Sequence, residues 1–156
     1  MLFRSALADI DGDRDLDLLV TVHGGGVQLF RNEGKGRFTH ARNSGLVASG
    51  GATSLALADT DSDGDLDLYV AHYRTTTIRS TGFSVLNVNG KRMIRPEDRD
   101  VLEYTTQGAI LEHGEPDAFY LNDGSGNFTL VPWNSGAFLD ENGAPLPAPQ
   151  IGRAHV

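Results

Sequence analysis

The stretch Asp9-Ile-Asp-Gly-Asp-Arg-Asp-Leu-Asp17 recurs 50 residues later as Asp59-Thr-Asp-Ser-Asp-Gly-Asp-Leu-Asp67. In each copy a largely apolar run follows, Leu16–Val22 in the first and Leu66–His72 in the second. Self-similarity over such a distance is the signature of a repeat architecture. We therefore expect two structural units of the same kind in this chain of 156 residues.

A second shared element supports the repeat. Leu29–Thr39 and Tyr120–Thr129 both contain the pattern N-x-G-x-G-x-F, in which the glycines permit a tight hairpin. The element begins much farther from the aspartates in the second unit than in the first. The second unit therefore carries an insertion, at about 73–116.

Each unit reads as four short strands. The predicted strands are Ser5–Ala8, Leu16–Val22, Val27–Arg31 and Arg37–Ala41, then Ser54–Ala58, Leu66–His72, Ala118–Leu121 and Asn127–Val131. Leu16–Val22 has apolar residues at alternate positions and on the opposite face too, which predicts a strand covered on both sides. A recurring four-stranded antiparallel unit is typical of a propeller blade. We predict an all-β fold, a partial β-propeller with two blades and a metal loop between strands one and two of each.

The chain divides accordingly into three regions. Residues 1–45 form the first blade, 50–135 the second blade with its insertion, and 136–156 a proline-marked linker toward a further blade. Within the insertion, Phe83–Val88, Asn89-Gly90 and Lys91–Ile94 predict a hairpin on a type I′ turn.

The negative charge is concentrated in the two repeated stretches. The formal net charge is −8, and residues 9–17 and 59–67 hold five aspartates each against a single arginine. Two carboxylates about 4 Å apart repel by about 4 kcal/mol at an effective dielectric constant near 20, so a converging cluster favours a bound cation. Ca²⁺ takes about 6–8 oxygen ligands. The candidate ligands are Asp9, Asp11, Asp13, Asp15 (through its carbonyl) and Asp17, with Asp59, Asp61, Asp63, Asp65 (through its carbonyl) and Asp67.

Other interpretations of the loops are weaker. An EF-hand requires a glutamate at the twelfth position, where this chain has Val20 and Val70. Zinc prefers His or Cys ligands, and Mg²⁺ keeps more waters. A solvated acidic turn is the plain alternative. The sixth loop position is Arg14 in the first copy and Gly64 in the second, which predicts tighter binding by the second loop if that position needs a positive φ.

These motifs resemble the FG-GAP/VCBS repeat family. The resemblance implies an integrin-α-like β-propeller with calcium in the loop between the first two strands of a blade. The insertion, with Tyr73–Arg79 and Gly114–Asp117, resembles bacterial proteins related to cartilage acidic protein, which often carry ASPIC/UnbV modules. The family implies an extracellular, cell-surface or periplasmic location. It also implies a scaffold or interaction module, part of a larger protein whose further blades are partners.

We expect no catalytic role. The chain has no cysteine, no membrane span and no basic patch for nucleic acid, and its histidines and serines lack a nucleophile motif. The expected partners are calcium and an unidentified protein or glycan. The alternative is a carbohydrate-binding, lectin-like segment or a carbohydrate-active enzyme fragment, in which Trp133 or the insertion contacts sugar.

Overall fold

The structure is a computed structural model, and it describes residues 4–78, 82–105, 107–146 and 154–155. Within these residues the regular elements are strands and two short 3-10 turns, Pro96–Asp98 and Trp133–Ser135. The predicted all-β class is confirmed. In the described part of the chain no helix has the length and apolar character needed to cross a membrane.

The first sheet is a four-stranded antiparallel meander. Its strands, hydrogen-bonded in chain order, are β1 (Ser5–Ala8), β2 (Asp17–Val22), β3 (Gly26–Asn32) and β4 (Phe38–His40). The predicted tight hairpin joins β3 to β4, where Glu33 N–H donates to Arg37 O at 2.8 Å. Gly34, Lys35 and Gly36 all have positive φ there.

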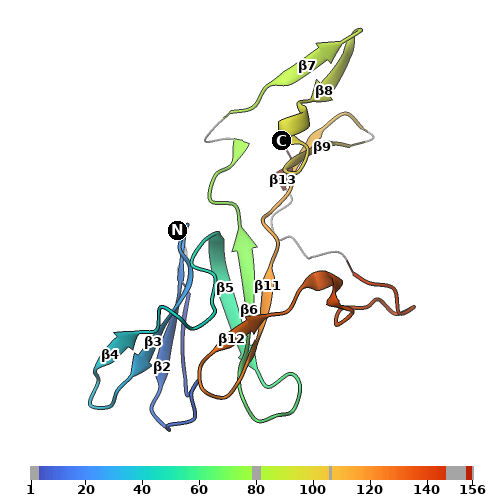
Figure 1. Cartoon of the computed structure of the whole chain (residues 1–156). Coiled ribbons are helices and arrows are strands. Elements are labelled where there is room, and N and C mark those ends of the chain that lie inside the picture. The colour runs from blue at the N-terminus through green and yellow to red at the C-terminus, as the bar shows by residue number, and fades with distance from the viewer. Residues whose placement is uncertain (1–3, 79–81, 106, 147–153, 156) are drawn as a thin grey trace.

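The second sheet has the same order but is interrupted in sequence. Its strands are β5 (Gly51–Ala58), β6 (Asp67–Tyr73), β11 (Ala118–Asn122) and β12 (Phe128–Leu130). The chain leaves the sheet after β6 and returns at β11, as Figure 1 shows. Two four-stranded antiparallel sheets are the arrangement expected of a partial propeller.

The main core lies between the two sheets. Leu19 and Leu29 of the first sheet belong to one buried cluster with Leu68, Val70 and Tyr120 of the second. Leu19 and Leu68 are 0 % exposed. This packing fixes one sheet against the other, with β5 of the second sheet beside β2 of the first.

The outer face of the first sheet is uncovered, which corrects the prediction that β2 is enclosed on both sides. Asp17, Leu19 and Thr21 are fully buried, but Leu18 and Val20 on the opposite face are only half-buried. Leu7 in the neighbouring strand pairs with Leu18 and is 59 % exposed. The prediction was wrong because nothing in the described residues packs on this face.

The segment between β6 and β11 projects away from the sheets (Figure 1). It contains β7 (Val85–Val88), β8 (Lys91–Ile94), β9 (Leu102–Tyr104) and β10 (Ile110–Glu112). Asn89 (φ 52) and Gly90 (φ 78) form the β7–β8 turn with the positive φ values of the predicted type I′ turn. Buried Glu112 anchors the segment by accepting from Ile78 N–H at 2.9 Å and pairing with Arg74 at 3.6 Å.

The chain after β12 returns to the second sheet. Phe138 lies 5.7 Å from the ring of Phe119 in β11 and 3.8 Å from that of Trp133, measured between ring centroids. Within residues 136–146, which belong to the predicted linker, Phe138 therefore packs on the outer face of this sheet. Strand β13 (Ala154–His155) pairs with β10, while 147–153 lie outside the described residues.

Candidate metal centre

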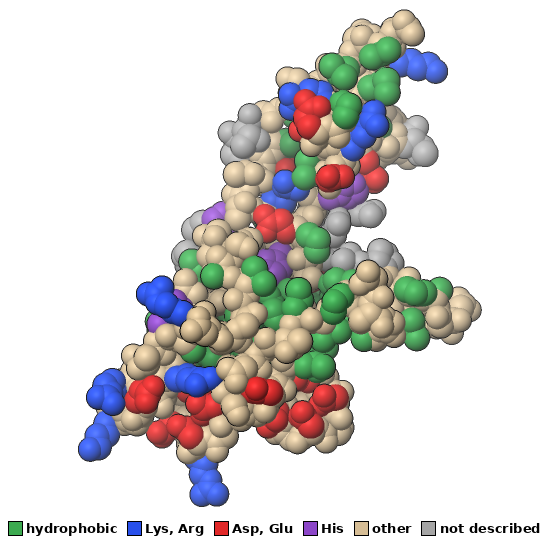
Figure 2. All heavy atoms as spheres, viewed as in Figure 1, with side chains coloured by type: hydrophobic (Ala, Val, Ile, Leu, Met, Phe, Trp, Pro, Cys, Tyr) green, Lys and Arg blue, Asp and Glu red, His purple; other side chains and the backbone are tan. Residues whose placement is uncertain are grey.

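Both aspartate-rich loops join the first two strands of a sheet, and acidic side chains gather at that end of the molecule in Figure 2. In the first loop, Asp9 accepts backbone bonds from Gly12 N–H at 2.9 Å and Arg14 N–H at 3.1 Å. The second loop repeats these bonds at Asp59, from Ser62 N–H at 2.7 Å and Gly64 N–H at 3.2 Å. The first aspartate of each copy thus shapes its own loop.

The backbone has a positive φ at the same two positions of each loop. The values are 80° at Gly12 and 76° at Arg14, and 67° at Ser62 and 96° at Gly64. The sixth position does adopt the left-handed conformation, as the prediction from Arg14 supposed. However, each loop contains one glycine and one residue for which this conformation costs on the order of 1 kcal/mol. Backbone strain therefore does not distinguish the loops.

The last aspartate of each loop is buried and tied to the backbone. Asp17 is 0 % exposed and Asp67 is 1 % exposed. Each accepts from a residue early in its own loop and from the asparagine that ends the third strand of its sheet. Asp17 accepts from Ile10 N–H at 3.0 Å and from Asn32 N–H at 2.8 Å. Asp67 accepts from Thr60 N–H and from Asn122 N–H, both at 3.0 Å. This carboxylate therefore connects the loop to the hairpin of the same blade.

Three carboxylates converge in each loop. One oxygen from each member lies within 4.8 Å of the others in two sets: Asp9, Asp11 and Asp17, and Asp59, Asp61 and Asp63. The remaining predicted ligands, Asp13, Asp15, Asp65 and Asp67, are not part of these close sets. Both sets consist of hard oxygen donors, the kind that Ca²⁺ binds.

Asp13 and Asp63 help to order the loops through a bond two residues along the chain. Asp13 Oδ1 accepts from Asp15 N–H at 2.8 Å, and Asp63 Oδ1 accepts from Asp65 N–H at 2.9 Å. The Asp65 carboxylate lies directly against Gly124, where an added Cβ would come within 2.4 Å of Oδ2. The glycine-rich hairpin therefore packs closely on the loop of its own blade.

The electrostatics of the clusters favour neutralisation. Burial, followed by repulsion from Asp17 and Asp13, raises the pKa of Asp11 above its usual value. Desolvation and repulsion from Asp63 likewise raise the pKa values of Asp61 and Asp65. Asp11 Oδ1 is buried and has no hydrogen-bond partner in the described part of the chain. A buried acceptor left in this state is costly, and a cation would satisfy it.

The surroundings of the two loops differ in charge. Arg31 Nε lies 3.8 Å from Asp11 Oδ2, and Arg31 also donates to Ser125 O at 2.6 Å. The equivalent position in the second blade is Leu121, so that loop has no such cation. Instead, Asp123 contributes repulsion to Asp65. The first loop is thus partly neutralised by the protein itself.

Sequence reasoning had not given a role to Asn32, Asn122 or Arg31. The two asparagines were visible as the first letter of the repeated N-x-G-x-G-x-F pattern, but only the fold brings their N–H groups to Asp17 and Asp67. Arg31 had no repeat signal, because it is present in only one copy.

The described histidines lie away from the aspartate clusters. His23 Nε2 is 3.1 Å from Thr75 O, the His40 ring stacks on Phe30, and His113 Nε2 is 3.5 Å from Glu103 Oε2. The indole of Trp133 donates to Asp117 O at 2.8 Å and packs on Phe138. These contacts account for each ring through ordinary packing and hydrogen bonding.

Comparison with known protein families gives a match to part of the chain. A family model described as an FG-GAP-like repeat matches residues 9–70, which include both aspartate loops. No curated protein gives a significant match to the chain. No solved structure does so either.

Proposed function

We propose that this chain is a calcium-binding β-propeller segment that serves as an interaction module outside the cytoplasm. The observation that carries the proposal is the convergence of three carboxylates in each copy of a repeated loop, with Asp11 Oδ1 buried and unpartnered. The FG-GAP-like match over residues 9–70 supports a β-propeller-like interaction module. FG-GAP repeats are typically extracellular, which is the basis of the proposed location. A relationship to bacterial proteins related to cartilage acidic protein, which often carry ASPIC/UnbV modules, is part of the same proposal.

The proposed calcium ligands are those that the structure groups. Asp9, Asp11 and Asp17 would hold one ion, and Asp59, Asp61 and Asp63 the other. A bound divalent cation would supply positive charge that offsets the carboxylate repulsion. The protein supplies the rest: Asp17 and Asp67 fix each loop to the asparagine at the end of the third strand. Binding would therefore stabilise the connection between the first three strands of a blade.

The proposed interaction surface is the outer face of the first sheet. Leu18, Val20 and Phe30 occupy there the positions that Leu68, Val70 and Tyr120 occupy in the second sheet, as the strand registers show. In the second sheet these residues are buried against the first. The uncovered face is therefore suited to another blade of the same kind, which agrees with a segment of a larger propeller whose partner is a protein.

We propose no catalytic role, and we place the carbohydrate alternative second. Trp133 was the candidate for stacking on a sugar, but Phe138 packs on its ring at a centroid distance of 3.8 Å.

Thermal unfolding with and without calcium tests the proposal. Calcium at 100 times its Kd stabilises a folded protein by about 2.7 kcal/mol per site, so the melting temperature should rise. The double variant Asp59→Asn and Asp61→Asn should lose part of this rise and half of the bound calcium measured by elemental analysis. Asp100→Asn, an exposed aspartate of the insertion, is the matched control. Equal melting temperatures and equal ion content after chelation and after saturation would refute calcium binding.

A further inference from the structure

The outer face of the second sheet repeats a surface that is buried in the first. The strand registers pair Leu19 with Leu29 in the first sheet and, at the equivalent positions, Tyr69 with Phe119 in the second. Leu19 and Leu29 are 0 % and 1 % exposed because the second sheet covers them. Tyr69 and Phe119 are only half-buried. The second sheet thus presents outward the kind of face that packs against another sheet within the chain.

A pocket of about 550 Å³ lies on this outer face. Its lining comes from the strands, the second aspartate loop and the chain after β12, and includes Tyr69, Phe119, Leu121, Thr60, Asp61 and Phe138. Ile10, the equivalent of Thr60 in the first blade, is 2 % exposed and belongs to the core between the sheets, whereas Thr60 is exposed. The space that the second sheet fills beside the first blade is therefore open beside the second blade.

The chain after β12 leaves room for a further sheet, because it follows the path of the chain after β4. Ala41 N–H donates to the third strand of the first sheet at 2.9 Å, and Val131 N–H donates to the third strand of the second sheet at 2.8 Å. Farther along, Leu46 packs against the core between the two sheets. Phe138 lies against the outer face in the same manner, and it borders the pocket without filling it.

Polar contacts at the junction between the two blades join a hairpin to a loop. The hairpin of the second blade (residues 122–128) lies against the first loop, where Asn122 Nδ2 donates to Ile10 O at 2.9 Å. Arg31, beside the first loop, donates to Ser125 O of this hairpin at 2.6 Å. The hairpin itself contains one acidic and no basic residue. The positive charge at this junction therefore comes from the blade that carries the loop.

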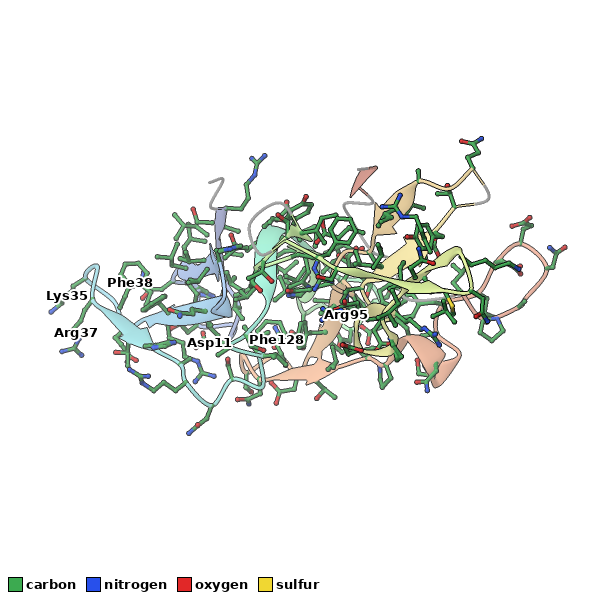
Figure 3. The ribbon with its side chains drawn as sticks, turned by 90° about the horizontal axis from the view of Figure 1, so that it is seen from above. Asp11, Lys35, Arg37, Phe38, Arg95 and Phe128 are labelled. Atoms are coloured by element: carbon green, nitrogen blue, oxygen red, sulfur yellow. The ribbon has the colours of Figure 1, made fainter. Side chains whose placement is uncertain are left out.

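The charges are exchanged at the outer face of the second sheet. Leu121 takes the place of Arg31, and residues 59–67 hold five aspartates and no basic residue. The hairpin of the first blade (residues 32–38) has two basic residues against one glutamate, with Lys35 in the place of the serine. Lys35 is exposed at the tip of this hairpin, as Figure 3 shows. The first hairpin thus carries the positive charge that the second loop lacks, and such complementarity selects one partner over others.

We propose that the outer face of the second sheet binds the first blade of a second copy of this chain. The uncovered face of that blade, which includes Leu7, Leu18, Val20 and Phe30, would pack on the second sheet as the second sheet packs on the first within one chain. Lys35 of the copy would then lie beside the second loop. A second copy is the occupant that the observations select, because it carries both the matching apolar face and the basic hairpin.

This contact joins two different faces, so it is heterologous and can close into a ring. Since a propeller has about four to eight blades, a ring of two-blade chains would contain about two to four copies. The inference rests on the proposed role of the uncovered first sheet as a docking face for a blade, and it adds the partner and the surface that receives it.

Sedimentation velocity of the intact chain over a range of protein concentrations tests the inference. We expect association into a discrete oligomer, weakened by high salt because Lys35 and the second loop carry opposite charges. Leu7→Asp places a charge in the uncovered face of the first sheet and should abolish the association. Leu86→Asp, which changes an exposed leucine of β7, is the matched control and should associate as the wild type does.

A pair of variants tests which face receives the copy. Leu121→Arg should weaken association about fivefold, because the new guanidinium would face Lys35 of the copy. Adding Lys35→Ser recreates the pairing of Arg31 with Ser125 seen within the chain, so it should restore the association. Lys91→Ser removes an exposed lysine from the insertion and should not restore it.

The inference is overturned if the wild-type chain stays monomeric at every concentration. It is also overturned if Leu7→Asp abolishes association while Leu121→Arg leaves it unchanged, since two first sheets would then face each other. Circular dichroism shows whether each variant is folded, and the behaviour of the wild type decides the first outcome without any variant. A monomer that still binds calcium would overturn this inference alone, whereas an oligomer without bound calcium would overturn only the proposed calcium binding.

Discussion

Arg31 and Asp11 form an ion pair in the first blade, with Nε and Oδ2 3.8 Å apart. At the equivalent position of the second blade Leu121 pairs with Thr129 across the hairpin, so this position supplies no arginine to the second loop. An internal cation competes with an external one for the same carboxylate. The two proposed calcium sites therefore differ in the charge around their carboxylates, through Arg31 in β3 against Leu121 in β11 as well as through Arg14 against Gly64 within the loops.

The first prediction concerns the replacement Arg31→Leu. Removing the guanidinium should raise the calcium affinity of the first loop about fivefold, since a charge about 4 Å away in a solvent-exposed setting is worth about 1 kcal/mol. Isothermal titration calorimetry should be done in the Asp59→Asn, Asp61→Asn background, so that only the first loop reports. Arg37→Leu is the control, because Arg37 projects from the hairpin tip away from Asp11 (Figure 3). An unchanged or lower affinity in Arg31→Leu would contradict this assignment.

The second prediction separates structure from ligation at Asp17. Asp17→Asn removes one of two acceptor oxygens that bond to Ile10 N–H and Asn32 N–H. Leaving a buried backbone donor unpaired costs about 1–3 kcal/mol, so the free energy of unfolding should fall by this amount even in chelator. Asp13→Asn, at an exposed position, should have little effect under the same conditions. Urea titrations in chelator measure both, and equal stabilities of the two variants would argue against the structural role.

Much of the fold could be predicted because each repeat contains local signals for its strands and turns. The alternation in Leu16–Val22 and the glycines of Asn32–Gly36 specify a strand and a hairpin locally, and both are present. The type I′ turn at Asn89-Gly90 is local in the same sense. Periodicity also shows that two faces of β2 are apolar, but it cannot tell which of them meets a neighbour. Coverage depends on the packing of a whole second sheet.

The candidate site was predictable in its ligand types and less so in its arrangement. The alternating aspartates predict the clusters. Tertiary contacts decide which role each aspartate has: Asp17 bonds to the backbone, whereas Asp11 Oδ1 has no hydrogen-bond partner among the described residues. The same holds for Arg14. The comparison with Gly64 suggested a positive φ at Arg14, and the structure has one. The positive φ at Ser62 was not predicted, because a serine does not by itself indicate a left-handed conformation.

The third prediction tests a close contact between the blades. Gly45 has φ +80°, and a Cβ there would lie 2.0 Å from Phe128 O in the second sheet. Next to it, Ser44 O accepts from Phe128 N–H at 2.7 Å. Gly45→Ala should therefore separate the two sheets locally and destabilise the protein by clearly more than the conformational cost alone.

Gly36→Ala isolates that conformational cost. Gly36 has φ +72° but nothing within 4 Å of an added Cβ, so its replacement should cost on the order of 1 kcal/mol. Thermal or urea unfolding compares the two variants. If Gly45→Ala is no more destabilising than Gly36→Ala, the contact between Gly45 and Phe128 is not as tight as described.

The last prediction concerns acid stability through His72. Burial lowers the pKa of its imidazole in the folded protein from the ordinary value of 6.5. As the pH falls below about 6.5, the unfolded chain takes up a proton that the folded protein still excludes, so the free energy of unfolding decreases. The decrease should continue until the pH reaches the lowered pKa of the folded state. Above about pH 6.5 both states are neutral, and the contribution no longer varies with pH.

The variant His72→Phe removes this proton uptake, so its free energy of unfolding should fall less steeply than that of the wild type as the pH is lowered below about 6.5. His40→Phe is the matched control, since His40 stacks on Phe30 in the first sheet and is not buried. Urea unfolding at a series of pH values from 8 downward measures the slopes. Parallel curves for the wild type and His72→Phe would show that the imidazole remains as easily protonated in the folded protein as in the unfolded chain.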